Sequence, residues 1–254
     1  MLSSFAGGTL FGERHGEAPL QVLALHGWAR THQDFEGVFA DDKGHTLRAI
    51  ALDLPGFGAT PGLERAMSSR DFAEMIAPIL DEASQPVVLV GHSHGGRVAV
   101  ELASLRPEQV AGIVLVAAPV LRLSSSTKPS WRYRLARKAH AWHLLSDERF
   151  EARRARSGSR DYNAAHGVLR DTLVTIINES FEDELRALRC PVALVWGERD
   201  GDVPLSIAER ARDLIRSAGP VAPAVSLVVL EGVGHLVPTS APSALRTVID
   251  GMVR

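Results

Sequence analysis

The chain has 254 residues, of which 45% are hydrophobic and 23% charged, and its formal net charge is −2. This composition is typical of one large soluble domain or a domain with an insertion, and the near-neutral charge gives no reason to expect nucleic acid as a partner. No apolar stretch approaches the ~20 residues that span a membrane, and the N-terminus lacks the features of a signal peptide. The single cysteine, Cys190, cannot form an internal disulfide, so we expect a cytoplasmic protein.

Six short runs rich in Val, Leu and Ile are predicted to be strands buried on both faces. They are residues 21–25, 47–52, 87–90, 111–116, 192–196 and 225–230. Helical patterns over 71–80, 207–215 and 244–253 alternate with them, and the first of these places Phe72, Met75, Ile76 and Ile79 on one face, with Pro78 as an unfavourable residue inside it. This alternation predicts an α/β fold, a mostly parallel sheet with helices on both faces.

Residues 121–185 interrupt the alternation with a polar, turn-rich start followed by amphipathic helical patterns. We therefore expect a helical cap over 121–185, inserted into a core formed by residues 1–120 and 186–254. From Arg122 to Arg170, twelve Lys or Arg residues face four Asp or Glu residues. The cap's aromatic residues are candidates for an apolar substrate pocket, or for the cap's own core: Trp131, Tyr133, Trp142 and Phe150.

Ser93 is the centre of the sequence Gly91-His92-Ser93-His94-Gly95, which follows a predicted strand and precedes a helix-compatible run. A serine at such a turn adopts a strained backbone conformation that only small neighbouring residues tolerate. The turn exposes its hydroxyl at the N-terminus of the following helix. The pattern predicts that Ser93 is a nucleophile.

A serine hydroxyl needs a nearby base, and the base needs a carboxylate that orients it. Asp200 follows the strand predicted at 192–196, and His235 follows the one at 225–230. In parallel sheets such strand ends meet at one edge, so Ser93, His235 and Asp200 are the candidate catalytic residues. Asp202, two residues further on, is a second candidate for the carboxylate.

An oxyanion formed by attack of the serine requires two preorganised N–H donors. The backbone amides of His94 and Trp28 are the candidates, because one follows the nucleophile and the other lies in the loop after the first strand. We interpret His26 as a structural histidine, His92 as a packing residue, and residues 53–58 as a tight turn. The histidines show no metal-ligand spacing and no phosphate-binding motif is present, so we expect neither metal nor cofactor.

These motifs resemble the α/β-hydrolase superfamily over nearly the full chain. The resemblance rests on five segments: residues 26–28, 53–58, 91–96, 197–204 and 234–235. It implies an α/β-hydrolase core with Ser93, Asp200 and His235 as the triad and the Trp28 and His94 amides as the oxyanion hole. The serine separates the chain from similar haloalkane dehalogenases and epoxide hydrolases, which use an aspartate nucleophile.

The expected activity is hydrolysis of a carboxylic ester of a small-molecule acyl substrate through an acyl-enzyme. The same triad serves C–C bond hydrolases, thioesterases, amidases and a few lyases, and the sequence does not separate these. The basic cap motivates a narrower hypothesis, an anionic substrate or an acidic carrier protein, as in similar hydrolases that demethylate carrier-bound esters, although a solvated arginine-rich surface is the simpler explanation of the charge. A non-catalytic, receptor-like protein is the remote alternative.

Overall fold

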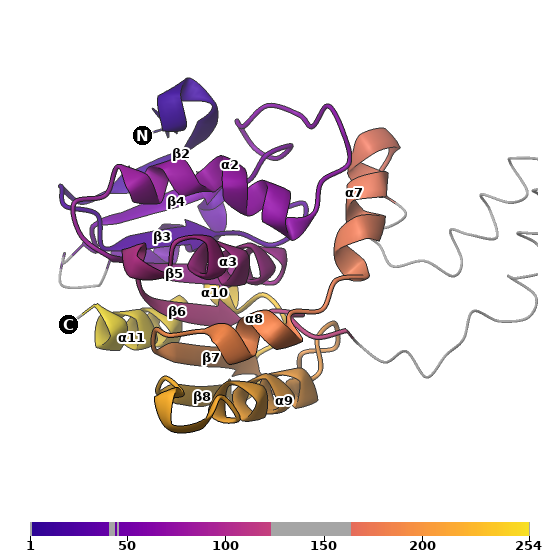
Figure 1. Ribbon diagram of the computed structural model, residues 1–254. Coiled ribbons are helices and arrows are strands. Elements are labelled where there is room, and N and C mark those ends of the chain that lie inside the picture. Colours follow the sequence, from indigo (N-terminus) through magenta and orange to yellow (C-terminus); the bar gives the residue numbers. More distant parts are fainter. Residues whose placement is uncertain (1, 41–43, 45, 123–163, 254) are drawn as a thin grey trace, which may run out of the picture.

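The computed structural model describes residues 2–40, 44, 46–122 and 164–253. Eight strands form one sheet in the order β1-β2-β4-β3-β5-β6-β7-β8 (Figure 1). From β4 to β8 all neighbouring strands pair in parallel, whereas β2 pairs antiparallel with both β1 and β4. The strands are β1 (Leu2–Phe5), β2 (Leu10–His15), β3 (Val22–Leu25), β4 (Ala49–Asp53), β5 (Val87–His92), β6 (Val110–Val116), β7 (Val192–Gly197) and β8 (Val225–Leu230).

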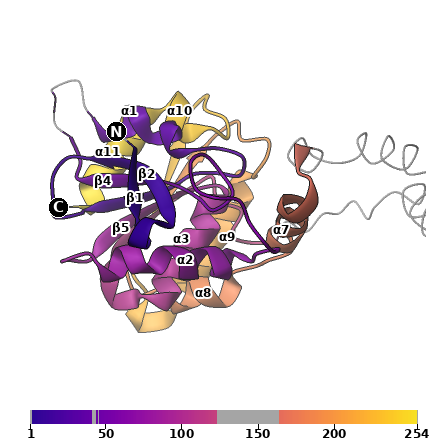
Figure 2. The ribbon, with the colours of Figure 1, turned by 90° about the horizontal axis from the view of Figure 1, so that it is seen from above.

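The helices cover both faces of this sheet, as the sequence predicted (Figure 2). One face carries α2 (Ser69–Asp81), α3 (His94–Leu105), α8 (Glu182–Ala187) and α9 (Leu205–Arg216), and the other carries α1 (Glu36–Phe39), α10 (Val237–Ser240) and α11 (Pro242–Met252). In β3, Leu23 and Leu25 pack in the core beneath α2, α3, α8 and α9, and Val22 and Ala24 pack in the core beneath α1, α10 and α11. Side chains alternate between faces along a strand, and both faces are covered, so the central strands are continuously apolar.

The two N-terminal strands were not predicted. β2 lies near the edge of the sheet and alternates between buried and half-buried positions, ending in the polar residues Glu13, Arg14 and His15. Such a strand lacks the continuous apolar run by which the buried parallel strands are recognised.

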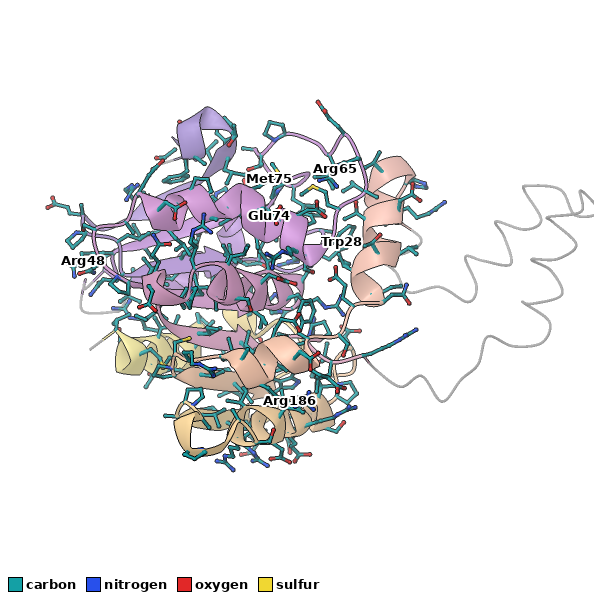
Figure 3. The ribbon with its side chains drawn as sticks, in the orientation of Figure 1. Trp28, Arg48, Arg65, Glu74, Met75 and Arg186 are labelled. Atoms are coloured by element: carbon teal, nitrogen blue, oxygen red, sulfur yellow. The ribbon has the colours of Figure 1, made fainter. Side chains whose placement is uncertain are left out.

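Helix α2 differs from its prediction on one face. Phe72, Ile76 and Ile79 are buried, but Met75 is 40% exposed and lies on the outer side with Glu74 (Figure 3). Adjacent helical residues are about 100° apart, so the buried stripe that includes Ile76 and Ile79 turns Met75 outward. The helix begins at a capping box between Ser68 and Asp71 and continues through Pro78 to Asp81.

Helix α7 (Gly167–Ile177) lies against the core at the carboxyl end of the sheet (Figure 1). The Oγ1 atom of Thr172 accepts a hydrogen bond from the Met67 amide at 3.2 Å. Just beyond the helix, the Glu179 carboxylate accepts one from the Ser69 amide at 2.9 Å. The buried Arg97 guanidinium donates to the carbonyl of Pro119 at 2.8 Å and to that of Ile176. Polar contacts thus connect α7 and its following loop to α2 and α3.

The sequence placed the cap over 121–185, and residues 123–163 of it lie outside the described residues. Its four candidate pocket aromatics, Trp131, Tyr133, Trp142 and Phe150, fall in that part. Within the described ranges, none of the helices combines the length and the apolar character that crossing a membrane requires.

Candidate active site

Ser93 connects β5 to α3 in a strained conformation, with φ 50° and ψ −114°. A non-glycine residue at positive φ costs about 1–3 kcal/mol and is retained where the surrounding structure enforces it. Here the Ser93 amide donates to the Val116 carbonyl at 2.9 Å. A Cβ atom at Gly91 would lie 2.4 Å from the Gly95 carbonyl oxygen, and one at Gly95 would lie 2.1 Å from that of Leu25. The glycines therefore let strand and helix approach, and they leave the half-buried Ser93 at the turn.

Asp200 and His235 are hydrogen-bonded to each other, with 2.9 Å between Oδ2 and Nδ1. The Asp200 side chain is 1% exposed and that of His235 16% exposed. Burial acts to raise the pKa of Asp200, but hydrogen bonds from His235 and two backbone amides outweigh it, so the pKa lies below its usual value. Because the carboxylate accepts the Nδ1 proton, Nε2 of His235 is left as a proton acceptor.

Asp202 supports Asp200 through its backbone. Its amide and that of Val203 each donate to Asp200 Oδ1 at 2.9 Å, while residue 202 itself is exposed. Of the two candidate carboxylates, it is thus Asp200 that accepts the hydrogen bond from His235. Among the described residues, the ligand atoms of Asp200, Asp202 and His235 also lie within 4.8 Å of one another, a spacing that a metal ion could bridge. A metal there would have to displace the hydrogen bond between Asp200 and His235.

Three loops meet around Ser93. A Cβ atom at Gly27, in the loop after β3, would lie 3.3 Å from the Cβ of Ser93 and 3.0 Å from Nδ1 of His92. The His92 ring in turn hydrogen-bonds the backbone carbonyl of His235, with 3.0 Å between Nε2 and the oxygen. The structure therefore brings the predicted nucleophile, base and oxyanion loops together at the carboxyl ends of β3, β5 and β8.

The two predicted oxyanion donors are the backbone amides of Trp28 and His94. In the part of the chain that the structure describes, no backbone carbonyl accepts the amide N–H of Trp28 or of His94. The following amides are occupied, since Gly95 donates to the His26 carbonyl at 3.1 Å and Gly96 to that of Ser93 at 3.0 Å. Both candidate amides can thus donate to an oxyanion.

His26 is a structural histidine, as predicted. Its Nδ1 atom donates to the Gly27 carbonyl at 2.7 Å, and Nε2 accepts from the Leu54 amide at 2.9 Å. This bond joins the loop after β3 to the turn after β4. Burial lowers the pKa of His26 to about 4, so the ring stays neutral at pH 7.

The rings of His92 and His94 are also buried and neutral. Burial lowers the pKa of His92 to about 4 and that of His94 to about 3. The ring of His94 packs edge-on against Phe72 and Trp28, with centroid distances of 4.9 and 5.8 Å. The sequence indicated that the backbone of His94 matters more than its ring. It gave no signal for the bond from His92 to His235, which spans 143 positions.

Residues 53–58 form the expected tight turn. Asp53 is fully buried and accepts from the amides of His32 and Ala59 at 2.8 and 2.9 Å. Gly58 has φ +55°, and a Cβ atom there would lie 2.2 Å from the Asp53 carboxylate. The turn places the Phe57 ring 5.0 Å from that of Trp28, edge to face.

Trp28 forms part of an apolar wall that the sequence did not reveal. Besides its contact with Phe57, the Trp28 side chain packs against Ala165 and against Leu173 and Ile176 of α7 (Figure 3). Together with Phe57, these residues place an apolar surface beside the serine turn. Pockets for acyl groups combine such a surface with a few placed polar groups.

Comparisons with known proteins identify the family of the chain and agree with its fold. Residues 22–248 match the alpha/beta hydrolase family. A pimeloyl-[acyl-carrier protein] methyl ester esterase of Chromobacterium violaceum is 31% identical over 77% of this chain and 82% of its own. Lipase LipV of Mycobacterium tuberculosis is 26% identical over 93% and 95%. Among solved structures, a thermophilic esterase from Thermogutta terrifontis superposes with a TM-score of 0.69 at 20% identity, covering 97% of this chain and 94% of that one.

Proposed function

The chain belongs to the α/β-hydrolase family and is a hydrolase, and from this premise we propose that it cleaves a carboxylic ester through a covalent acyl-enzyme. The observation that carries the proposal is the Asp200–His235 hydrogen bond at the same edge of the sheet as the strained Ser93 turn. A buried carboxylate that orients a half-exposed imidazole is what a serine nucleophile needs for its activation.

In the proposed reaction, Ser93 Oγ attacks the ester carbonyl while His235 Nε2 accepts the hydroxyl proton. Asp200 stabilises the resulting imidazolium, and the Trp28 and His94 amides donate to the oxyanion. The C–O bond to the alcohol then breaks, and His235 returns the proton to the leaving oxygen. Water, deprotonated by His235, then attacks the acyl-enzyme carbonyl. The bond between the acyl carbon and Ser93 Oγ breaks, His235 returns the proton to Oγ, and the acid is released.

For the substrate, we favour an ester whose acyl chain is anionic or is attached to an acidic carrier protein. Two observations support this choice: the excess of basic residues from Arg122 to Arg170, and the 31% identity to an esterase named for a carrier-bound methyl ester. Basic residues near a site raise the local concentration of anionic partners and speed their association. Thioesters and C–C bonds remain the competing substrates of the same triad.

The reaction is tested with p-nitrophenyl esters of increasing chain length and with a fluorophosphonate that labels activated serines. We expect labelling of the wild-type protein and loss of both labelling and turnover in Ser93→Ala.

Asp200→Asn should lower kcat by about 10³–10⁴-fold, because it removes the acceptor that orients His235. The matched control Asp202→Asn should stay within about twofold, since it keeps the backbone amide that supports Asp200. Undiminished turnover by Ser93→Ala would refute the proposed reaction.

The substrate class is tested by comparing one methyl ester free in solution and attached to an acyl carrier protein. We expect a lower KM for the carrier-bound ester and a KM that rises with ionic strength, as screening weakens attraction between opposite charges. The double substitution Arg153→Glu and Arg154→Glu should remove most of that salt dependence and leave hydrolysis of p-nitrophenyl acetate unchanged. Equal KM values for the free and carrier-bound esters would exclude a carrier protein as part of the substrate.

A further inference from the structure

His92, the last residue of β5, makes a contact that packing alone does not explain. It is 1% exposed, and its Nε2 atom lies 3.0 Å from the carbonyl oxygen of His235. A carbonyl oxygen can only accept, so Nε2 must carry the proton. Nδ1 is then a bare acceptor, and among the described residues it has no hydrogen-bond partner.

A buried nitrogen without a partner is unfavourable, and an apolar side chain would avoid that cost. The favourable contact that the imidazole makes in exchange is the one to His235. The two rings lie side by side, with 5.0 Å between their centroids. The carbonyl of His235 also accepts from the Val237 amide at 2.9 Å, so two donors hold this one oxygen.

We infer that His92 is a positioning residue, whose Nε2–H holds the backbone of His235 at the distance from Ser93 that proton transfer requires. The inference rests on the proposed role of His235 as the general base. Asp200 fixes the ring of His235 at Nδ1, but it does not fix where the backbone carries that ring. His92 fixes the position of that backbone, and it directly precedes Ser93 in the chain. The nucleophile and the base are therefore linked through one peptide unit and one hydrogen bond.

The surroundings of His235 explain why such an anchor is needed. The loop between β8 and α10 is exposed or half-exposed, and Leu236 is 40% exposed. Upstream of His235, the Arg199 backbone amide donates to the Val233 carbonyl at 2.8 Å and the Gly232 amide to the Glu198 carboxylate at 2.9 Å, and downstream the Val237 amide donates to the His235 carbonyl itself. A displacement of about 1 Å between reacting groups can cost about 10²-fold in rate.

The buried position also keeps His92 in the form that its role requires. Burial lowers the pKa of His92 to about 4, so at neutral pH the ring carries one proton and no charge. A charged ring at this distance would oppose the imidazolium that forms on His235 during the reaction. A neutral donor anchors the loop without that repulsion.

The test uses three substitutions at position 92. The amide nitrogen of His92→Gln lies as many bonds from Cα as Nε2 does, so it can donate to the same carbonyl. His92→Met has similar length and no donor, and His92→Asn has a donor that is one bond too short. We expect kcat for a p-nitrophenyl ester to fall about 10- to 100-fold in the Met and Asn variants, with KM within about twofold. His92→Gln should recover most of the loss.

A double-mutant cycle separates positioning from a general structural role. In a His235→Ala background, adding His92→Met should leave the residual rate unchanged, because residues that act as one unit are not additive. Urea unfolding midpoints show which variants are folded, and Gln and Asn keep the comparison valid if Met does not fold.

The outcomes distinguish this inference from the proposed function. Absence of fluorophosphonate labelling in the wild type, or full turnover by Ser93→Ala, would refute the triad itself. With an active wild type, the positioning role is overturned by any of three results. These are full kcat in His92→Met and His92→Asn, no recovery in a folded His92→Gln, or an undiminished His92→Met effect in the His235→Ala background.

Discussion

Three buried neutral histidines predict that the protein loses stability in mild acid. Burial lowers the pKa of His26 and His92 from 6.5 to about 4 and that of His94 to about 3. In the unfolded chain these rings take up protons near pH 6.5, whereas in the folded protein they do not. The unfolded state therefore binds more protons than the folded state between about pH 6.5 and 4. The stability that the three neutral histidines contribute is fully present above pH 6.5, and the free energy of unfolding decreases as the pH falls through that range.

The magnitude follows from these values. A group with an unfolded pKa of 6.5 that stays neutral in the folded state lowers the free energy of unfolding by about 1.3 kcal/mol between pH 7 and 5.5. Three such groups together give about 4 kcal/mol, a large share of the roughly 5–15 kcal/mol typical of a domain. His15, whose pKa burial also lowers, adds in the same direction, and Glu101, whose pKa burial raises, subtracts. Most carboxylates titrate below this window.

The assay is urea unfolding at pH 7.0, 6.5, 6.0 and 5.5 at constant ionic strength, followed by circular dichroism. His94→Leu is the informative variant, because that ring has no hydrogen-bond partner among the described residues and packs against aromatic side chains. We expect it to reduce the loss between pH 7 and 5.5 by about 1.3 kcal/mol. The exposed His166→Gln controls for removal of a histidine as such. Equal free energies of unfolding at pH 7.0 and 5.5, or a His94→Leu slope like that of the wild type, would refute the reasoning.

Two further predictions concern the turn at Ser93 and the contact of α7. Gly95→Ala should lower the free energy of unfolding by about 3 kcal/mol or more, because its Cβ would lie 2.1 Å from the backbone carbonyl oxygen of Leu25. The control Gly62→Ala should change the free energy of unfolding by less than about 0.5 kcal/mol, because a Cβ there meets nothing within 4 Å. Urea unfolding decides this, and similar values for the two variants would contradict it. Arg97→Met should remove the hydrogen bonds to Pro119 and Ile176 and cost about 2–3 kcal/mol. Amide exchange should then be faster in α7 and unchanged in α9; unchanged protection of α7 would show that its apolar contacts suffice.

The central strands could be predicted because their pattern depends on the sheet alone. The runs at 87–90 and 192–196 became β5 and β7 with ends shifted by no more than two residues, since both faces of these strands are buried. Strands β1 and β2 could not be predicted in this way, because a strand at the edge of the sheet needs apolar residues at only some of its positions. Met75 was misplaced because a stripe of four apolar residues around α2 is wider than the face that the core covers.

The candidate site was predictable at the level of residues and not of contacts. Ser93, Asp200 and His235 each follow an apolar run, so their common edge follows from the parallel arrangement. The choice between Asp200 and Asp202 required the loop geometry, in which one carboxylate turns inward and the other residue contributes its amide. The apolar wall at Trp28 depends on where α7 docks, and no local pattern encodes that.

Four histidines near the carboxyl ends of the strands show why burial, rather than residue type, separates a candidate catalytic base from the residues that surround it. His26, His92 and His94 are at most 3% exposed, and none of them has a carboxylate as a hydrogen-bond partner among the described residues. Burial without a counter-charge disfavours the imidazolium, so these rings are poor bases at neutral pH. His235 alone of the four combines partial exposure with a buried carboxylate partner, the setting in which a ring can gain and lose a proton during turnover. That difference arises from neighbours such as Asp200, which lies 35 positions from His235 in the sequence, so it emerges only when the strands are assembled.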